Sequence, residues 1–309
     1  AKAVRDATML PKRSFTLLLI SDSVLYRFSP ESSQPEAIWN LKGKEVAGLE
    51  AYPADNGIVL AFRQLGSPVL HLVKSDSKGQ QRHFFASLYL DRLDRLEPSS
   101  DGSLLIVGEE LGRKVLKILD KEGREVSFRD RTPLGSVETA FWLEDGSLLA
   151  LTNRFQEKQW VLASATGTSR FIASRLALSQ PSMTFSEGAH GAFVLAGGTL
   201  YHIRFHEESS EETTLLTGVS GAARLKDRWA IVKDGVLTVG TFAGGQWTSQ
   251  TVDARPGIYD LVRFSSDGGW LVYRYRQKET DTGQVHLLHL ATGQNLGLGM
   301  SASFLTLVR

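Results

Sequence analysis

The sequence predicts an all-β chain folded as a seven-bladed β-propeller of four-stranded antiparallel blades. Two observations predict this fold: a turn motif followed by an apolar strand recurs along the chain, and the two chain ends each supply part of one further unit. Of the 309 residues, 42% are hydrophobic and 22% are charged, which is enough apolar material for a packed core. We therefore expect a single propeller domain over residues 1–309.

The repeated motif is a short polar turn that leads into an apolar strand. Its three clear copies lie at 97–108, 142–151 and 264–273, and weaker copies lie at 52–60, 186–195 and 225–232. The turn glycines Gly57, Gly102, Gly146 and Gly191 stand 44 or 45 positions apart. Because an Asp-Gly pair supplies the positive φ angles of a tight hairpin turn, each copy predicts a connection between two strands.

The apolar run after each turn predicts a strand that is buried on both faces, because hydrophobic residues follow one another without strict alternation. A further strand, a second turn and a short fourth strand complete each unit. This count gives six complete blades at 45–86, 90–128, 135–173, 181–217, 220–252 and 257–298.

The two chain ends complement each other. Residues 14–40 supply three strands without a first strand, and residues 301–309 supply one strand with nothing after it. Joined, they make a seventh blade that closes the ring and removes open sheet edges. We expect the C-terminal strand to pair with the N-terminal strands.

Two segments also fit a helical pattern. Leu88, Leu90, Leu93 and Leu96 alternate with Asp and Arg, and residues 172–178 are similar. We assign most of each segment to a first strand or a connecting loop.

The pattern Ser-x-Asp-Gly before an apolar strand, as in Ser99-Ser100-Asp101-Gly102, resembles the WD-type and TolB-like propeller repeats. The similarity covers nearly the whole chain. The Gly-His and Trp-Asp signatures of true WD repeats are missing from every blade, so the resemblance implies the fold alone. Interaction scaffolding is the common role that this superfamily implies.

Several function classes lack their sequence signals. The net charge of +1 gives no sign of a nucleic-acid or membrane-surface protein. The chain has no cysteine, so it contains neither disulfides nor thiolate metal sites. No Gly-x-Ser-x-Gly elbow, P-loop or dinucleotide fingerprint is present. Residues 265–270 resemble a sialidase Asp-box with the wrong spacing, and we interpret them as a plain turn.

Metal binding is not predicted from the seven histidines. His202/His206 and His286/His289 have helical metal-ligand spacing, but they fall on predicted strands, where that spacing separates the side chains or turns them to opposite faces. Glu109, Glu110, Asn153 and Asp234 lie near the ends of second strands, where lactonase-like propellers hold a metal. We interpret them as ordinary loop residues and expect no catalytic residue, metal or cofactor.

The loops after the second strands share one face of a propeller with the loops between blades, and here they are rich in arginine and aromatic residues. That composition is typical of interface hot spots and also of anion sites. The candidate partner-binding face comprises Arg63, Arg113, Arg154, Phe155, Lys233, Tyr275 and Arg276, with Arg131, Arg175 and Arg255 between blades. The alternative is a solvated rim of mixed charge. The six tryptophans are expected to pack in the core.

The function predicted from these observations is a non-enzymatic scaffold that binds another protein, with no nucleic acid and no membrane insertion. A propeller enzyme, hydrolase or lactonase-like with a channel metal, is the alternative, and a ligand-sensing or carbohydrate-binding domain is a third. The absence of cysteine favours a bacterial periplasmic or cell-surface location, with the cytoplasm as the alternative. Residues 15–20 are too short an apolar run for a leader, so we expect this sequence to contain none.

Overall fold

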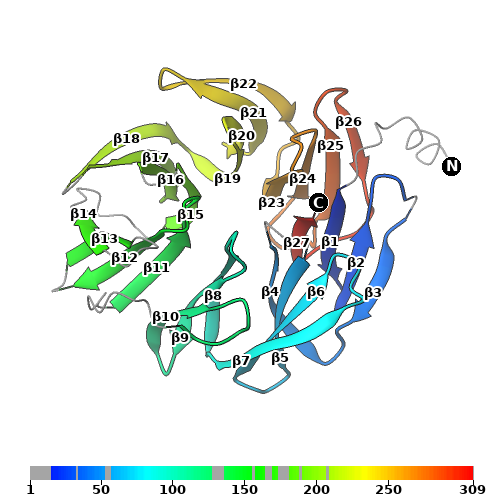
Figure 1. The fold of residues 1–309 in the computed structure, drawn as a ribbon. Coiled ribbons are helices and arrows are strands. Elements are labelled where there is room, and N and C mark those ends of the chain that lie inside the picture. Colours follow the sequence, from blue (N-terminus) through cyan, green and yellow to red (C-terminus); the bar gives the residue numbers. More distant parts are fainter. Residues whose placement is uncertain are drawn as a thin grey trace.

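The computed structural model describes residues 15–32, 34–52, 57–126, 136–154, 157–163, 169–172, 181–187, 190–206 and 209–308. Within these ranges the chain forms strands and turns and no α-helix. The strands make seven antiparallel sheets that follow one another around a ring (Figure 1). The predicted fold class, an all-β seven-bladed propeller, is confirmed.

We number the blades in chain order and begin with the sheet that starts at Lys44, because it is the first one formed by four consecutive strands. The strands of each blade are given from the innermost to the outermost. Blades 1 to 3 contain β4 (Lys44–Ala51), β5 (Gly57–Gln64), β6 (Val69–Asp76) and β7 (Arg82–Tyr89); β8 (Arg92–Pro98), β9 (Leu104–Glu110) and β10 (Arg113–Leu119); and β11 (Ser136–Trp142), β12 (Leu148–Arg154), β13 (Glu157–Ala163) and β14 (Ser169–Ile172).

Blades 4 to 6 contain β15 (Pro181–Ser186), β16 (Gly191–Ala196), β17 (Thr199–Phe205) and β18 (Ser210–Thr217); β19 (Val219–Leu225), β20 (Arg228–Lys233), β21 (Val236–Ala243) and β22 (Gln246–Asp253); and β23 (Ile258–Phe264), β24 (Trp270–Arg276), β25 (Gln284–His289) and β26 (Gln294–Gly297). Blade 7 contains β27 (Phe304–Val308), β1 (Thr16–Ser21), β2 (Val24–Phe28) and β3 (Glu36–Asn40).

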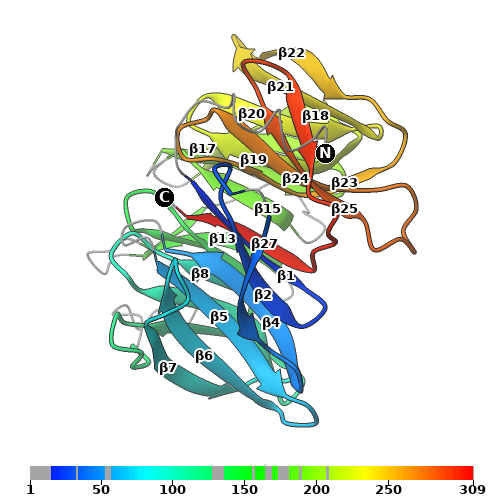
Figure 2. The same cartoon turned by 90° about the vertical axis from the view of Figure 1, so that its right-hand side faces the viewer.

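Blade 7 joins the two ends of the chain. β27 pairs antiparallel with β1, with Thr16 opposite Val308 and Ile20 opposite Phe304. Figures 1 and 2 both show β27 beside β1. The predicted closure of the ring by N- and C-terminal strands is therefore confirmed.

Blade 2 has three strands within the described residues. An isolated antiparallel bridge joins Leu119 to Glu125, where its expected fourth strand begins. Residues 127–135, on which the rest of that strand falls, lie outside the described residues.

Seven hydrophobic clusters hold the blades together, each between two neighbouring sheets. β9 shows how one strand serves two clusters. Leu104 and Ile106 face blade 1, whereas Leu105 and Val107 face blade 3, and all four are fully buried. The continuous apolar runs in the sequence therefore arise from burial on both faces. 

The helical alternative for residues 88–96 is wrong. Leu88 lies near the end of β7 and Leu96 lies in β8. Leu90 lies in the connection between these two strands and is buried. Each leucine packs in the cluster between blades 1 and 2, which overrides the local pattern. Of residues 172–178, Ile172 ends β14 and the others lie outside the described residues.

The three clear copies of the motif form the same turn. In each, the glycine N–H donates to the carbonyl three residues earlier, at 3.2 Å for Gly102, 3.0 Å for Gly146 and 2.8 Å for Gly268. Within each of these turns the glycine alone takes a positive φ, which is 88° for Gly102, 78° for Gly146 and 70° for Gly268. The aspartate instead accepts a backbone N–H two residues later, as Asp101 does from Ser103 at 2.9 Å. The expectation of positive φ angles thus applies to the glycine alone.

Six of the seven innermost strands carry a bulge in their pairing with the second strand. The register shifts occur between Val46/Gly48, Leu93/Arg95, Val137/Thr139, Pro181/Met183, Val219/Gly221 and Asp260/Arg263. A bulge adds a residue to one strand and changes the direction of the side chains after it. The recurrence of the bulge gives the inner strands a common way to present side chains to the middle of the ring.

The described part of the chain contains no helix with the length and apolar character needed to cross a membrane.

Candidate functional site

The structure separates the predicted face into two groups of residues. Tyr275 and Arg276 lie at the end of β24 with Arg255, and Arg63 and Arg113 lie where blade 1 connects to blade 2. Lys233 ends β20 and has no ion pair with any described residue. The side chain of Arg154 and all of Phe155, Arg131 and Arg175 lie outside the described residues.

Arg63 is buried and serves the connection between blades 1 and 2. Its Nη2 donates to the carbonyl of Leu90 at 2.9 Å. The charge of Arg63 is therefore used inside the fold. Arg113, at the start of β10, is exposed and has no ion pair with any described residue.

Large apolar side chains are exposed around this same connection. Leu65 follows β5 and is 73% exposed, Tyr89 ends β7 and is 44% exposed, and Leu111 follows β9 and is 77% exposed. Only two other large apolar side chains in the described ranges, Phe84 and Val126, are comparably exposed. We call Leu65, Tyr89, Leu111 and Arg113 the blade 1–2 patch.

Backbone hydrogen bonds connect the loops that carry the patch. Leu90 N donates to Pro68 O at 3.4 Å, which fixes the end of β7 against the loop of Leu65. Asp91 N donates to Glu109 O at 2.7 Å, and Asp91 Oδ2 accepts from Gly112 N at 3.3 Å. The turn of Leu111 is therefore attached to the connection that begins after Tyr89.

Leu111 has an unfavourable backbone conformation. Its φ is 51° and that of Gly112 is 72°, so the pair forms a two-residue turn with both φ angles positive. Such turns favour Asn, Asp or Gly at the first position. The corresponding turns of three other blades have Asp22, Gly197 and Asp234 there. Blade 2 alone places an exposed leucine in this strained position, which is typical of a site kept for a purpose other than stability.

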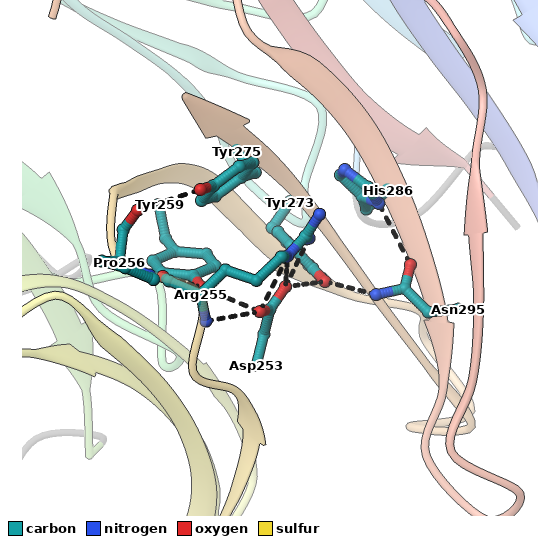
Figure 3. Close-up of polar contacts among 8 residues, drawn as sticks. All are labelled: Asp253, Arg255, Pro256, Tyr259, Tyr273, Tyr275, His286 and Asn295. Atoms are coloured by element: carbon teal, nitrogen blue, oxygen red, sulfur yellow. Dashed lines mark hydrogen bonds and ion pairs between the residues drawn. The ribbon is translucent and has the colours of Figure 1, made fainter. Parts of the chain in front are cut away.

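A buried polar network lies at the other group of residues, where blade 5 connects to blade 6 (Figure 3). Asp253, the last residue of β22, binds Arg255 through both carboxylate oxygens, with Arg255 Nε at 3.0 Å from Oδ1 and 3.1 Å from Oδ2. Tyr259 and Tyr273 donate their hydroxyl protons to the same carboxylate at 2.9 Å and 2.8 Å. The network fixes the crossover to the next blade.

The network continues through Asn295 to His286. Asn295 Nδ2 donates to the Tyr273 hydroxyl at 2.8 Å, and its Oδ1 lies 3.1 Å from His286 Nδ1. Because Oδ1 can only accept, the histidine carries its proton on Nδ1. Burial lowers the pKa of His286, and the charge of Arg255 lowers it further. The ring is therefore neutral around pH 7 and stacks on Tyr273 with centroids 5.4 Å apart.

The pKa of Asp253 explains why this network is unsuited to proton transfer. Burial alone would raise that pKa, but the hydrogen bonds from Arg255, Tyr273 and Tyr259 outweigh it and lower the pKa to about 2. Both tyrosine pKa values are raised, first by burial and then by the Asp253 carboxylate. The carboxylate stays ionised and the hydroxyls stay protonated at neutral pH, so the groups serve as a fixed clamp.

Tyr275 and Arg276 belong to the edge of this clamp. The guanidinium of Arg255 lies 4.2 Å from the Tyr275 ring centre, and the Tyr275 hydroxyl donates to Pro256 O at 2.9 Å. Arg276 Nη2 binds Asp260 Oδ2 at 2.8 Å. Arg255, Tyr275 and Arg276 belong to the face expected from the sequence. Sequence reasoning missed Asp253, Tyr259, Tyr273 and Asn295, because no local spacing connects residues on four different strands.

The lactonase-like ligand set is not assembled as a metal site. Glu109 pairs with Arg92 at 3.3 Å, and Glu110 pairs with Lys117 at 3.1 Å. Asp234 occupies its hairpin turn, and Asn153 is exposed near the end of β12. Among the histidines, His202 contacts Glu187 at 2.5 Å. Across the described ranges, no group of three His, Asp or Glu side chains is arranged to hold a metal ion.

The fold defines the class of protein, a seven-bladed β-propeller. No model of a known protein family matches the chain. No curated protein matches it either.

Solved structures that are similar to this chain have widely different descriptions. One is a putative 6-phosphogluconolactonase from Bacteroides uniformis, with a TM-score of 0.60 and 12% identity, covering 96% of this chain and 99% of that chain. A chain of a nidogen/laminin complex gives 0.53 and 10%, covering 96% and 98%. TolB from Acinetobacter baumannii gives 0.50 and 14%, covering 96% and 66%. At these identities the similarity shows the propeller fold alone, as the resemblance to TolB-like repeats implied.

Proposed function

We propose that the protein is a non-enzymatic binding module that holds another protein on the blade 1–2 patch. The observation that carries this proposal is the exposure of Leu65, Tyr89 and Leu111 on three connected loops. Arg113 lies beside them and has no ion pair with any residue that the structure describes. Aromatic, large apolar and arginine side chains on one surface are the composition of interface hot spots. Scattered exposed leucines need no explanation, but a cluster on adjoining loops does.

The backbone strain at Leu111 supports the same proposal. A leucine in the left-handed conformation costs about 1–2 kcal/mol relative to the right-handed one. Its side chain buries little apolar surface in return, because it is 77% exposed. A protein partner that covers Leu111 would bury its apolar side chain, which the isolated chain leaves in solvent.

The similar structures are consistent with this proposal and also with its alternative. One belongs to a nidogen/laminin complex and another to a putative lactonase, so the fold supports both binding and catalysis. A propeller enzyme with a channel metal is the alternative, and elemental analysis of the purified protein tests it. A periplasmic or surface location of the binding module remains a prediction.

The test uses the protein as bait in an extract of its source, followed by direct binding of the purified partner. The variant Leu65→Asp/Leu111→Asp places two charges in the patch, and Phe84→Asp changes an equally exposed apolar residue on the outer strand β7. We expect the double variant to weaken the partner's Kd at least about tenfold, since hot-spot residues contribute 2 kcal/mol or more, roughly. Phe84→Asp should bind like the wild type.

Equal partner affinity in the wild type and the double variant would contradict the proposal. Catalytic turnover with a channel-bound metal would favour the enzyme instead.

A further inference from the structure

The middle of the ring contains a cavity of about 580 Å³. It is lined by inner strands of blades 1, 2, 4, 5, 6 and 7, and its charged residues are Glu50, Asp94, Arg95, Glu97, Arg224 and Arg263. Leu96, Met183, Phe185, Phe264 and Phe304 provide apolar walls. The cavity is therefore large enough for a small organic molecule and has both apolar and charged surface.

Arg95 and Arg263 are held loosely by the carboxylates around them. Arg95 Nη1 lies 3.6 Å from Glu97 Oε2, and Arg263 Nη2 lies 3.9 Å from Glu50 Oε1. Both separations exceed hydrogen-bond length. Outside the channel, Arg274 binds Asp260 through Nε at 2.6 Å and Nη2 at 2.8 Å. The two channel arginines therefore keep the planar donors that Arg274 has already used.

Arg95 is nevertheless fixed in orientation. Its guanidinium lies 4.0 Å from the centre of the Phe141 ring. Stacking of this kind holds the guanidinium plane and leaves its edge free to donate hydrogen bonds. Arg263 is 40% exposed, and its one side-chain hydrogen bond within the described residues goes to its neighbour, Val262 O, at 3.1 Å. One arginine is thus preorganised and the other can adjust to a ligand.

The carboxyl groups beside them are poorly suited to ionisation. Burial raises the pKa of Glu50, against the opposing effects of Arg263 and Arg95. Burial raises the pKa of Glu97 to about 7, although Arg95 and the Trp142 N–H partly oppose it. Oε2 of Glu97 is buried and has no hydrogen-bond partner among the described residues. When Glu50 and Glu97 are protonated they lose their negative charge, so the positive charges of Arg95 and Arg263 are no longer balanced.

The opposite wall has its own balance of charge. Arg224 donates to Ser186 O and packs over Phe193 and Trp229, and Glu187, Glu144 and Asp227 surround it. Asp94 binds Lys114 and Arg92, which lower its pKa despite its burial. Asp94 is compensated by the cations that bind it, whereas Arg224 makes no ion pair within the described residues and its buried Nε has no hydrogen-bond partner there. Protonation of Glu50 and Glu97 changes the charge balance at Arg95 and Arg263, the arginines beside these carboxyl groups.

We propose that the channel binds a small organic anion, with its carboxylate between Arg95 and Arg263 and its apolar part against the phenylalanine walls. Guanidinium groups bind carboxylates through paired, charge-assisted hydrogen bonds, and the low-dielectric channel strengthens them. Binding draws a proton from solvent onto Glu97, because the ligand's charge replaces that of the glutamate. The site is independent of the blade 1–2 patch.

The test is an NMR titration that follows the arginine Nε–Hε signals, assigned with Arg95→Lys and Arg263→Lys. Benzoate serves as a carboxylate with an apolar ring, and inorganic phosphate serves as an anion without one. We expect benzoate to shift the Arg95 and Arg263 signals saturably at about 10 mM or below, and phosphate to bind more weakly. Affinity should be about tenfold higher at pH 6 than at pH 8, on either side of the Glu97 pKa of about 7.

Three variants test the site: the first two separate it from a general charge effect, and the third tests the pH dependence. Arg263→Gln should weaken benzoate at least about tenfold, the value of one charge-assisted hydrogen bond. Arg204→Gln, which removes an exposed arginine from β17 of blade 4, should leave the affinity for benzoate unchanged. Glu97→Gln resembles the protonated acid, so it should retain binding and lose most of the pH dependence.

Three results would overturn the inference: no saturable shift with benzoate at either pH, equal affinity of wild type and Arg263→Gln, or binding of phosphate alone. Thermal unfolding of each variant checks that it is folded, and Arg95→Gln provides a second variant if Arg263→Gln is not.

Discussion

Asp253 concentrates three hydrogen-bond donors on one buried carboxylate. Arg255, Tyr259 and Tyr273 all bind it, and its side chain is only 5% exposed. A carboxylate in such surroundings contributes to stability only while it is ionised. The effect of this residue on the whole chain can therefore be examined by substitution and by pH.

Asp253→Asn should lower the free energy of unfolding by about 2 kcal/mol at neutral pH, because the pKa of about 2 lies below the ordinary 3.8. The sign follows from the lowered pKa: this stability is present above about pH 4 and is lost as the pH falls toward 2. As the pH falls from about 4 toward 2, the free energy of unfolding of the variant should therefore decrease less than that of the wild type. Urea unfolding at several pH values measures both effects.

The matched control is Glu36→Gln, which removes an exposed ion pair with Arg27. Surface pairs contribute about 0–1 kcal/mol, so its effect should be small. Equal losses in the two variants would contradict the clamp assigned to Asp253.

Glu97 predicts the opposite pH dependence. Its pKa is raised to about 7 from 4.5, so the folded chain binds the proton more tightly than the unfolded chain. Stability should fall as the pH rises from about 4.5 to 7, by up to about 3 kcal/mol. Glu97→Gln should remove this fall and raise the unfolding midpoint at pH 8. If the free energy of unfolding of the variant depended on pH as that of the wild type does, ionisation of Glu97 would not destabilise the folded chain.

At the residue scale, the sequence identified side-chain types but not their partners. The sequence assigns Arg63, Arg255 and Tyr275 to one face, yet Arg63 is buried against Leu90 O, whereas Arg255 and Tyr275 join the network around Asp253. The difference depends on the path of the next blade, which no local pattern contains. The raised pKa of Glu97 could not be predicted either, because it arises from burial in the channel, which outweighs the opposing effects of Arg95 and the Trp142 N–H.

At the element scale, two turns with the same backbone conformation differ in how well their first residue suits it. The turns at Leu111-Gly112 and Asp234-Gly235 have matching positive φ angles, 51° and 72° against 50° and 75°. Leu111→Asn should raise the free energy of unfolding by about 0.5–1 kcal/mol, because asparagine tolerates this conformation better. The reciprocal Asp234→Leu should lower it by a similar amount. Denaturant titration of both variants measures the difference.

Those two substitutions also connect stability to binding. If the blade 1–2 patch holds a partner, Leu111→Asn should be more stable and bind less well. A variant that is destabilised by the asparagine would show that Leu111 is packed in solution.

The strands and turns were the features that the sequence predicted best. Ser-x-Asp-Gly turns and apolar runs located the strands because both depend on local chemistry: Ser265 Oγ, for example, donates to Asp267 and accepts from Trp270 N within one turn. The bulges of the inner strands escaped prediction. They depend on how each strand fits around the channel, and side chains such as Asp94 and Ser182 carry no signal for an extra residue.

At the scale of the whole molecule, the ring depends on every blade having two neighbours. Leu17 and Leu19 of β1 pack toward blade 6, whereas Leu18 and Ile20 pack toward blade 1. The chain ends meet in this blade, so the covalent break in the ring is covered by the pairing of β27 with β1. The complementary incomplete segments made this closure predictable.

Removing residues 300–309 should therefore destabilise the whole ring. The truncation takes away buried Leu305 and Val308, exposes the edge of β1 and opens two interblade clusters. Large-to-small changes at single buried sites cost about 2–5 kcal/mol, so the loss should approach the total stability of a typical domain, about 5–15 kcal/mol. Hydrogen exchange should show lost protection in β20 of blade 5 as well as in β1. A synthetic peptide of residues 300–309 should restore protection, whereas the same peptide with Leu305→Asp should not. Loss confined to blade 7 would mean that the blades are stable without a closed ring.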